Sequence, residues 1–265
     1  GGVLGGAFVG IGVSSPGGST SPGGGAGAPA ERPRVAKGKR VIAHAAIACR
    51  TCDLCKGGLG QHCRARQVIG RSRDGPLADL IALPASALIS VPEALDDDRA
   101  ALVHAVAGAH HAATLVRLEG KTYVTVLGDT LQALLVAQLM AARNASVRVL
   151  GERPVRFGLA ERWSVRHRHV GEAGRRRDQD IVVDCTGSPP PRASLVDLRP
   201  IVENEVELLG CTGYGGTLEP ALDLLARRAV HVEPLIAGRL PLERAAEALN
   251  AGEPDLDSML VEFGE

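Results

Sequence analysis

The chain has 265 residues, carries no net charge when its histidines are neutral, and is 45% hydrophobic, which allows one large domain or two smaller ones. Aromatic residues make up only 2% of it, so the sequence offers neither the basic field nor the stacking platform of a nucleic-acid-binding protein. Its apolar runs are too short or too interrupted by polar residues to span a bilayer, and we expect no membrane insertion.

The first hundred residues predict short strands and loops. Residues 1–13 look like a strand with glycine turns, and residues 14–34 are a low-complexity run of Gly, Ser and Pro, which we expect to be a flexible loop. Strand-like character resumes at 40–48, and short β-type runs follow at 77–83 and 87–91. The start of the sequence has no basic region followed by an apolar one, so we expect no signal peptide and a cytoplasmic location.

Four cysteines lie close together with the spacing C-x2-C-x2-C-x7-C: Cys49, Cys52, Cys55 and Cys63. Thiolates brought together on a short loop can surround one Zn²⁺ tetrahedrally, and a closed shell of four is structural. Disulfides are a poor alternative, because cysteines at successive three-residue steps are badly placed to pair with one another. A nucleic-acid-binding zinc ribbon is disfavoured by the charge and the scarcity of aromatics. We therefore predict one structural zinc per chain, held in a lobe of residues 49–63.

From about residue 97 onward, predicted helices alternate with predicted strands. The helices are expected at 99–116, 131–143, 156–164, 219–228 and 242–250, and the strands at 122–127, 146–150, 181–184, 205–210 and 258–263. Such alternation indicates a parallel sheet with right-handed crossovers. Residues 166–177, rich in Arg and His, are expected to form a solvated loop.

The strand at 122–127 leads into a glycine and then a helix, which is the layout of a dinucleotide-binding unit. The fingerprint of that unit is G-x-G-x-x-G/A, and the run GDTLQA here supplies Gly128 and Ala133 but puts Thr130 at the second glycine position. At the end of the next strand, Glu152 could hold a ribose hydroxyl, or Arg153 could meet a 2′-phosphate. The sequence does not decide between NAD and NADP.

These features together resemble the zinc-containing medium-chain alcohol dehydrogenases. The matching segments begin shortly before the cysteine lobe and run along most of the chain: residues 38–41, 49–63, 74–93, 124–129, 182–188 and 234–249. The resemblance implies an α/β protein with a GroES-like β-barrel domain that bears the zinc lobe and a Rossmann-type domain that binds NAD(P). It also implies a homo-oligomer or a subunit of a larger assembly. An active member would transfer hydride between an alcohol carbon and nicotinamide, with a second zinc polarising the oxygen.

On this resemblance, residues 1–107 form the GroES-like domain, 108–229 the Rossmann-like domain, and 230–265 a segment that returns to the GroES-like domain. The Rossmann-like domain is expected to be shortened after residue 188. A βαβ crossover takes roughly 30 residues, and fewer separate Ser188 from the next strand-like run.

The sequence departs from the family at the catalytic zinc. The family's first ligand lies in a segment before residue 1, and its G-H-E motif is matched here by Gly6 in place of His and Ala7 in place of Glu. His104 stands at the third ligand position, but a single protein ligand does not hold a catalytic ion, which needs about three. We therefore expect an alcohol-dehydrogenase-like protein whose NAD(P)-dependent activity is weak or lost. The alternative is a pseudoenzyme that serves as a structural subunit or a ligand-binding module.

Overall fold

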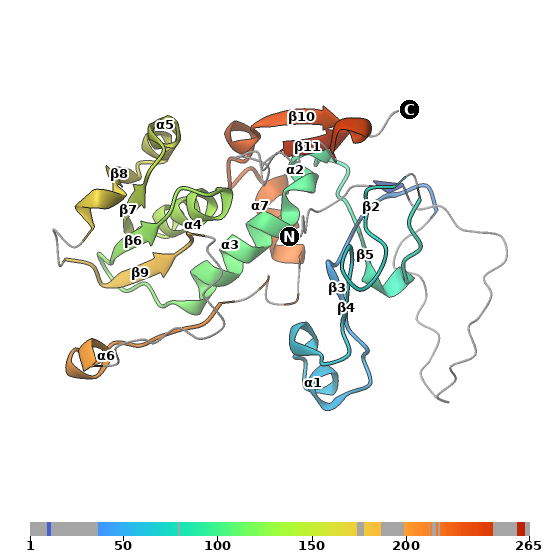
Figure 1. Cartoon of the computed structure of the whole chain (residues 1–265), viewed down its shortest axis with the longest axis horizontal. Helices are drawn as coiled ribbons and strands as arrows, with labels where there is room; N and C mark the ends of the chain where they lie inside the picture. Colours follow the sequence, from blue (N-terminus) through green and yellow to red (C-terminus); the bar gives the residue numbers. More distant parts are fainter. Residues whose placement is uncertain are drawn as a thin grey trace. The chain divides into compact units, whose positions relative to one another are not determined.

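The computed structural model describes residues 10–11, 37–78, 80–173, 178–186, 199–211, 213, 216, 218–245 and 259–262. The chain forms two compact units (Figure 1). The first comprises residues 1–104 and 216–265, and the second comprises residues 105–215. The expected strand at 1–13 is described only at its end, and the expected loop at 14–34 lies outside the described residues.

The first unit contains a three-stranded antiparallel sheet with the order β1-β2-β5. Its strands are β1 (Gly10–Ile11), β2 (Arg40–Ala43) and β5 (Leu88–Ser90). Ile42 of β2 lies opposite Ile89 and is completely buried, as expected for β-branched residues in the interior of a sheet. A second antiparallel pair, β3 (Ala46–Ile47) with β4 (Gln67–Val68), flanks the cysteine lobe.

The same unit includes the end of the chain. Helix α7 (Glu219–Ala226) buries Leu222 and Leu225, and strands β10 (Gly238–Pro241) and β11 (Met259–Glu262) pair in parallel. Of the helix expected at 242–250, residues 242–245 are helical and the rest lies outside the described residues.

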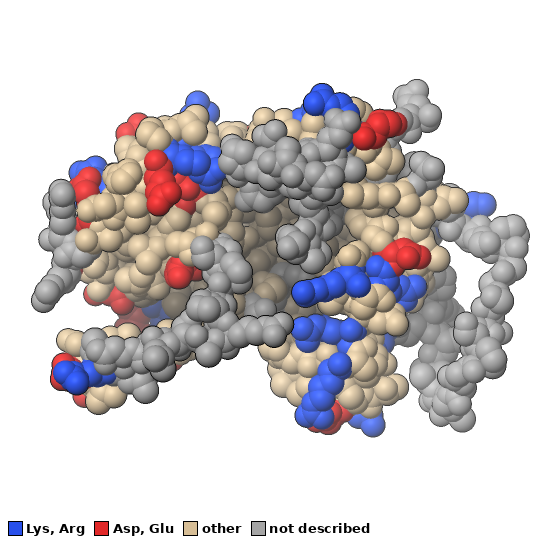
Figure 2. Space-filling view, in the orientation of Figure 1, with Lys and Arg blue, Asp and Glu red and all other residues tan. Residues whose placement is uncertain are grey.

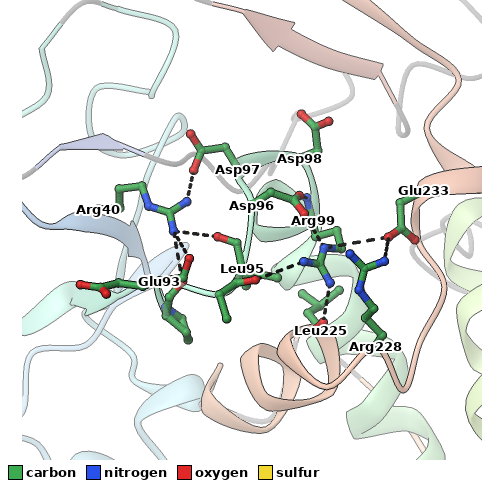
Figure 3. Close-up of polar contacts among 12 residues, drawn as sticks. Arg40, Glu93, Leu95, Asp96, Asp97, Asp98, Arg99, Leu225, Arg228 and Glu233 are labelled. Atoms are coloured by element: carbon green, nitrogen blue, oxygen red, sulfur yellow. Dashed lines mark hydrogen bonds and ion pairs between the residues drawn. The ribbon is translucent and has the colours of Figure 1, made fainter.

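The buried arginine Arg99 joins this C-terminal part to the middle of the chain (Figure 3). The single helix expected at 99–116 is in fact two, α2 (Asp97–Ala101) and α3 (Val103–Leu115). The side chain of Asp96 caps α2 by accepting from the Arg99 amide, and it also accepts from Arg99 Nε at 2.6 Å. Arg99 Nη1 donates to the carbonyl of Leu225 near the end of α7, 3.1 Å away, and the Arg99 side chain is only 4% exposed.

The next two aspartates form ion pairs with arginines of two strands. Asp97 pairs with Arg40 of β2 at 2.5 Å, and Asp98 pairs with Arg239 of β10. Asp97 and Asp98, together with Arg99, thus link α2 to segments of the first unit that are far apart in the sequence.

The second unit is built on a four-stranded parallel sheet with the order β8-β7-β6-β9. The strands are β6 (Tyr123–Leu127), β7 (Ser146–Gly151), β8 (Arg166–His169) and β9 (Ile181–Asp184). Helix α4 (Leu131–Ala142) packs on β6 and β7, and α5 (Pro154–Arg162) packs on β7 and β8 (Figure 1). The strand order reverses between β6 and β9, and such a switch point is where open α/β sheets bind ligands.

Three local predictions were wrong. Residues 77–83 contain no strand among those described, and residues 166–169, expected to be loop, form edge strand β8. The strand expected at 205–210 is absent: helix α6 (Arg199–Glu203) is followed by exposed, non-strand backbone through Cys211. No helix in the described part of the chain is long and apolar enough to cross a membrane.

Candidate metal centre and dinucleotide turn

The four cysteines converge on one point. Their Sγ atoms all lie within 4.8 Å of one another. The Sγ atom of Cys55 is 3.9 Å from that of Cys49 and 3.5 Å from that of Cys52, and Cys52 and Cys63 are 3.9 Å apart. A tetrahedral ion with Zn–S bonds of about 2.3 Å requires sulfur–sulfur distances of about 3.8 Å. The cluster therefore fits a structural zinc in both ligand type and spacing.

Short helical turns set this spacing. Cys52 is the N-cap of helix α1 (Asp53–Lys56), which carries Cys55, and Cys63 follows the single helical turn η1 (Gly60–His62). Between the two turns the backbone reverses through Gly58 with φ +78, a conformation that favours glycine. Cys63 is fully buried, while the other three cysteines are half-buried.

The sulfurs are also held by neighbouring donors. The hydroxyl of Thr51 donates to Cys49 Sγ at 3.5 Å, and the Cys49 amide donates to Cys63 Sγ at 3.4 Å. The bonds from Thr51 lower the pKa of Cys49 to about 5, whereas desolvation raises the pKa of Cys55 to about 12. Four crowded thiols cannot all ionise without a compensating cation, and a divalent metal supplies that charge.

A second metal centre is not formed by the described residues, in which the cysteine cluster is the only group of three or more close ligands. His104 is half-buried, and its Nε2 lies 2.9 Å from the carbonyl oxygen of Ala43. Desolvation lowers the pKa of His104 to about 4, so the ring is neutral at pH 7 and Nε2 donates its hydrogen to that carbonyl. Gly6 and Ala7 lie outside the described residues.

At the dinucleotide turn, Gly128 follows β6 with φ +99. A Cβ at this position would lie 2.8 Å from the carbonyl oxygen of Cys185, at the end of the neighbouring strand β9. Glycine is therefore required here by the close approach of two strand ends, whether or not a ligand binds.

Thr130 and Ala133, both predicted to belong to a cofactor site, are bonded to each other. Thr130 is the N-cap of α4, and its hydroxyl accepts from the Ala133 amide at 3.2 Å. The same hydroxyl donates to the Cys185 carbonyl at 3.0 Å. The side chain at the second glycine position thus ties the first turn of α4 to the end of β9.

Asp129, which lies between Gly128 and Thr130, was not singled out from the sequence. It is buried, and its carboxylate accepts from the amides of Glu152 and Arg153 at 3.0 and 2.7 Å. Arg153 adds two further bonds, from Nε to the carboxylate at 3.1 Å and from Nη2 to the Asp129 carbonyl at 2.9 Å. Gly151 accommodates this approach, because a Cβ there would lie 2.7 Å from the Asp129 side chain. Glu152 and Arg153 do follow β7 as expected, but the guanidinium of Arg153 is directed at Asp129.

Comparison with known proteins supports the family assignment. Residues 20–93 match the alcohol dehydrogenase GroES-like domain. The chain is 30% identical to an L-threonine 3-dehydrogenase of Mesorhizobium japonicum over 147 residues, 55% of this chain and 42% of that protein. It is 23% identical to a sorbitol dehydrogenase of Halalkalibacterium halodurans over 243 residues, 77% of this chain and 71% of that protein.

Solved structures share the fold. A zinc-binding dehydrogenase from Sinorhizobium meliloti, bound to NADP, matches with a TM-score of 0.73 at 22% identity, over 87% of this chain and 76% of that one. The alcohol dehydrogenase TADH from Thermus sp. ATN1 matches with a TM-score of 0.75 at 18% identity, over 86% of this chain and 80% of that one.

A GroES-like match, a parallel sheet with a glycine turn at its switch point, and a four-cysteine cluster define the class. These comparisons support the resemblance to the zinc-containing medium-chain alcohol dehydrogenases, and the predicted fold of a GroES-like domain with a Rossmann-type domain is confirmed. The chain spans only about two-fifths of the length of the threonine dehydrogenases that it matches at 30% identity or more.

Proposed function

We propose that this chain is an alcohol-dehydrogenase-like protein that binds one structural zinc through Cys49, Cys52, Cys55 and Cys63, and whose NAD(P)-dependent alcohol oxidation is weak or lost. The observation that carries the proposal is the occupation of the dinucleotide turn by the side chains of Asp129 and Thr130.

A bound dinucleotide places its pyrophosphate against the first turn of the helix, where backbone amides point at it and the second glycine permits close approach. Here the Cβ and hydroxyl of Thr130 stand at that glycine position, and the hydroxyl already accepts from the Ala133 amide. A pyrophosphate approaching this turn would have to displace the Thr130 side chain.

The residues expected to contact the adenosine end of the dinucleotide are already bonded to Asp129. The amides of Glu152 and Arg153 and the guanidinium of Arg153 are satisfied by the Asp129 carboxylate, whose side chain is only 10% exposed. A 2′-phosphate that recruited Arg153 would leave this buried carboxylate without its cation, which is costly. The pairing therefore weakens NADP recognition in particular.

The zinc, when bound, supplies rigidity and no chemistry of its own, because a shell closed by four thiolates leaves no position for substrate. The chain's own contribution is to hold the thiols at ligand spacing and to donate hydrogen bonds from Thr51 and the Cys49 amide to the sulfurs. Since such a site needs reduced cysteines, a reducing compartment such as the cytoplasm suits the protein.

The experiment is a calorimetric titration of zinc-loaded protein with NADH and NADPH, for the wild type and for Thr130→Gly. The wild type should bind neither cofactor with a dissociation constant below about 1 mM. Removing the threonine side chain should tighten binding at least about tenfold, or about 1.4 kcal/mol. Saturable low-micromolar binding by the wild type would overturn the proposal.

The pseudoenzyme alternative is favoured by the lack of a second cluster of metal ligands among the described residues. An assay of the wild type with NAD⁺ and NADP⁺ separates it from a weak enzyme. L-threonine and sorbitol are the first alcohols to try, since similar proteins carry those names. Measurable, zinc-dependent turnover supports a weak enzyme, and turnover indistinguishable from a blank supports a pseudoenzyme.

A further inference from the structure

The zinc lobe is strongly basic although the whole chain is neutral. Residues 50–73, called the basic lobe below, contain six Lys or Arg residues and a single acidic residue, Asp53. Figure 2 shows this concentration of positive charge over the lobe that contains α1. Charges of one sign gathered on a small surface attract a partner of the opposite sign. The basic residues are Arg50, Lys56, Arg64, Arg66, Arg71 and Arg73, and all but Arg73 are exposed.

Internal contacts use only part of that charge. Arg64 lies 3.5 Å from Asp53 in an exposed pair, and such a pair contributes little to stability. Within the described part of the chain, no hydrogen bond or ion pair engages the side chains of Lys56 or Arg66. These two exposed cations have no structural role that a partner would have to displace.

The turn that follows α1 presents an aliphatic side chain to solvent. Leu59 stands between Gly58 and Gly60, and it is 45% exposed. Its amide donates to the Leu54 carbonyl at 2.8 Å, and its carbonyl accepts from the His62 amide at 2.9 Å. Hydrogen bonds on both sides of the residue therefore fix the turn from which this leucine projects.

We propose that the basic lobe is a peripheral membrane contact, which binds the surface of a bilayer rich in anionic lipids and inserts Leu59 between the headgroups. The negative potential of such a surface attracts each Lys and Arg residue that lies close to it. Burial of an apolar side chain adds an attraction that salt does not screen. Stable binding to a bilayer surface takes two such signals together, and no segment of the chain has to cross the membrane.

The basic lobe fits an anionic bilayer better than it fits other polyanions. The backbone of a nucleic acid offers phosphates but no apolar region for Leu59, and residues 50–73 contain no aromatic side chain on which bases could stack. The core of a protein interface is apolar and fully buried, whereas Leu59 is the only exposed large hydrophobic among residues 50–73, all of which the structure describes. A single inserted side chain accompanied by cations suits a bilayer surface.

The first test is co-sedimentation of the zinc-loaded full chain with vesicles. The wild type should bind vesicles of equimolar phosphatidylcholine and phosphatidylserine at low salt, and should not bind phosphatidylcholine alone. High salt should release it, because screening acts over about 10 Å at 0.1 M salt but about 3 Å at 1 M.

Charge-reversed variants locate the contact on the lobe. Lys56→Glu/Arg66→Glu should lower partitioning onto the mixed vesicles at least about tenfold. The matched control, Arg117→Glu/Arg162→Glu, makes the same change in charge at exposed positions of the second unit and should bind like the wild type. Equal binding by the two double variants would overturn the proposal.

The second test measures insertion of the turn itself. The chain has one tryptophan, Trp163, in the second unit, so Leu59→Trp in a Trp163→Phe background carries a single fluorophore at the proposed contact. Mixed vesicles should shift its emission to shorter wavelength, and neutral vesicles should not. Leu59→Ser should weaken binding at least about threefold and leave its dependence on salt unchanged.

Three results would overturn the proposal. One is a wild type that binds neither kind of vesicle, or binds both equally. Another is an emission of the Leu59→Trp variant that mixed vesicles leave unchanged. The third is salt-sensitive binding of a DNA duplex without binding of vesicles, which would assign the basic lobe to a nucleic acid instead.

Discussion

The cysteine lobe and the dinucleotide turn both bring polar groups close together, but these groups are satisfied in different ways. In the lobe, four sulfurs lie at the spacing of zinc ligands and need an external cation. At the turn, Asp129, Thr130 and Arg153 satisfy the backbone and one another without any external group. The lobe is organised around a ligand, and the turn is organised around its own side chains. Zinc should therefore matter for stability, whereas a dinucleotide should add little.

The largest effect is expected from Cys52→Ser. Because metal binding is coupled to folding, losing one of four ligands should abolish stoichiometric zinc and lower Tm by several degrees or more. Metal analysis and calorimetry measure both quantities. Cys211→Ser is the control, because this thiol is exposed and lies outside the cluster. An unchanged zinc content in Cys52→Ser would contradict a four-cysteine site.

Arg99→Ala should have the next largest effect. Arg99 is buried and bonded to Asp96, Ala94 and Leu225, and breaking a buried charge network costs about 3–5 kcal/mol. The exposed pair of Arg64 is the matched contrast, since Arg64→Ala should change stability by only about 0–1 kcal/mol. Urea unfolding measures both, and equal effects would show that Arg99 does not hold α7 to α2.

Asp129→Ala tests the self-satisfied turn. The substitution removes the acceptor for two amides and for Arg153 Nε, and it should cost about 1–3 kcal/mol in unfolding free energy. Zinc content should stay at one per chain, because the cluster belongs to the other unit. Loss of zinc together with stability would mean that the two regions are not independent.

The smallest effect concerns pH at the N-cap of α2. Although burial acts to raise it, hydrogen bonds from the Arg99 amide and guanidinium lower the pKa of Asp96 below its usual 3.8. A depressed carboxylate pKa contributes stability above pH 3.8 and loses it as the pH falls through the folded-state value. Asp96→Asn keeps a capping side chain, so its difference from the wild type should shrink below about pH 3.8 in urea unfolding. A constant difference across that range would contradict the assignment.

The sequence predicted those features whose residue types and spacing have a single physical meaning. Cysteine spacing indicates a metal site, and the structure does bring the four sulfurs together. A buried strand followed by glycine and a helix indicates a βα turn, and β6, Gly128 and α4 form that turn. Asp129 was missed because its role depends on the end of β7, a separate strand that only the folded sheet brings alongside. The pair Gly128-Asp129 followed by Gly151 was a usable signal, since a glycine at the neighbouring strand end leaves room for a side chain.

Other errors have the same origin. Residues 166–169 are polar and were expected to be loop, but an edge strand with exposed residues can be polar throughout. Residues 205–210 have the alternation of a strand, but a strand also needs a neighbour, and the described structure gives them none. The predicted domain boundaries near residues 107 and 229 stay predictions. The structure divides the chain into compact units after residues 104 and 215.

The most direct test of this contrast is the titration of zinc-loaded wild-type protein with NADH. The account predicts one zinc per chain and no saturable heat of binding up to about 1 mM cofactor. One zinc per chain together with micromolar binding of NADH would show that the turn opens readily, and would contradict the central claim.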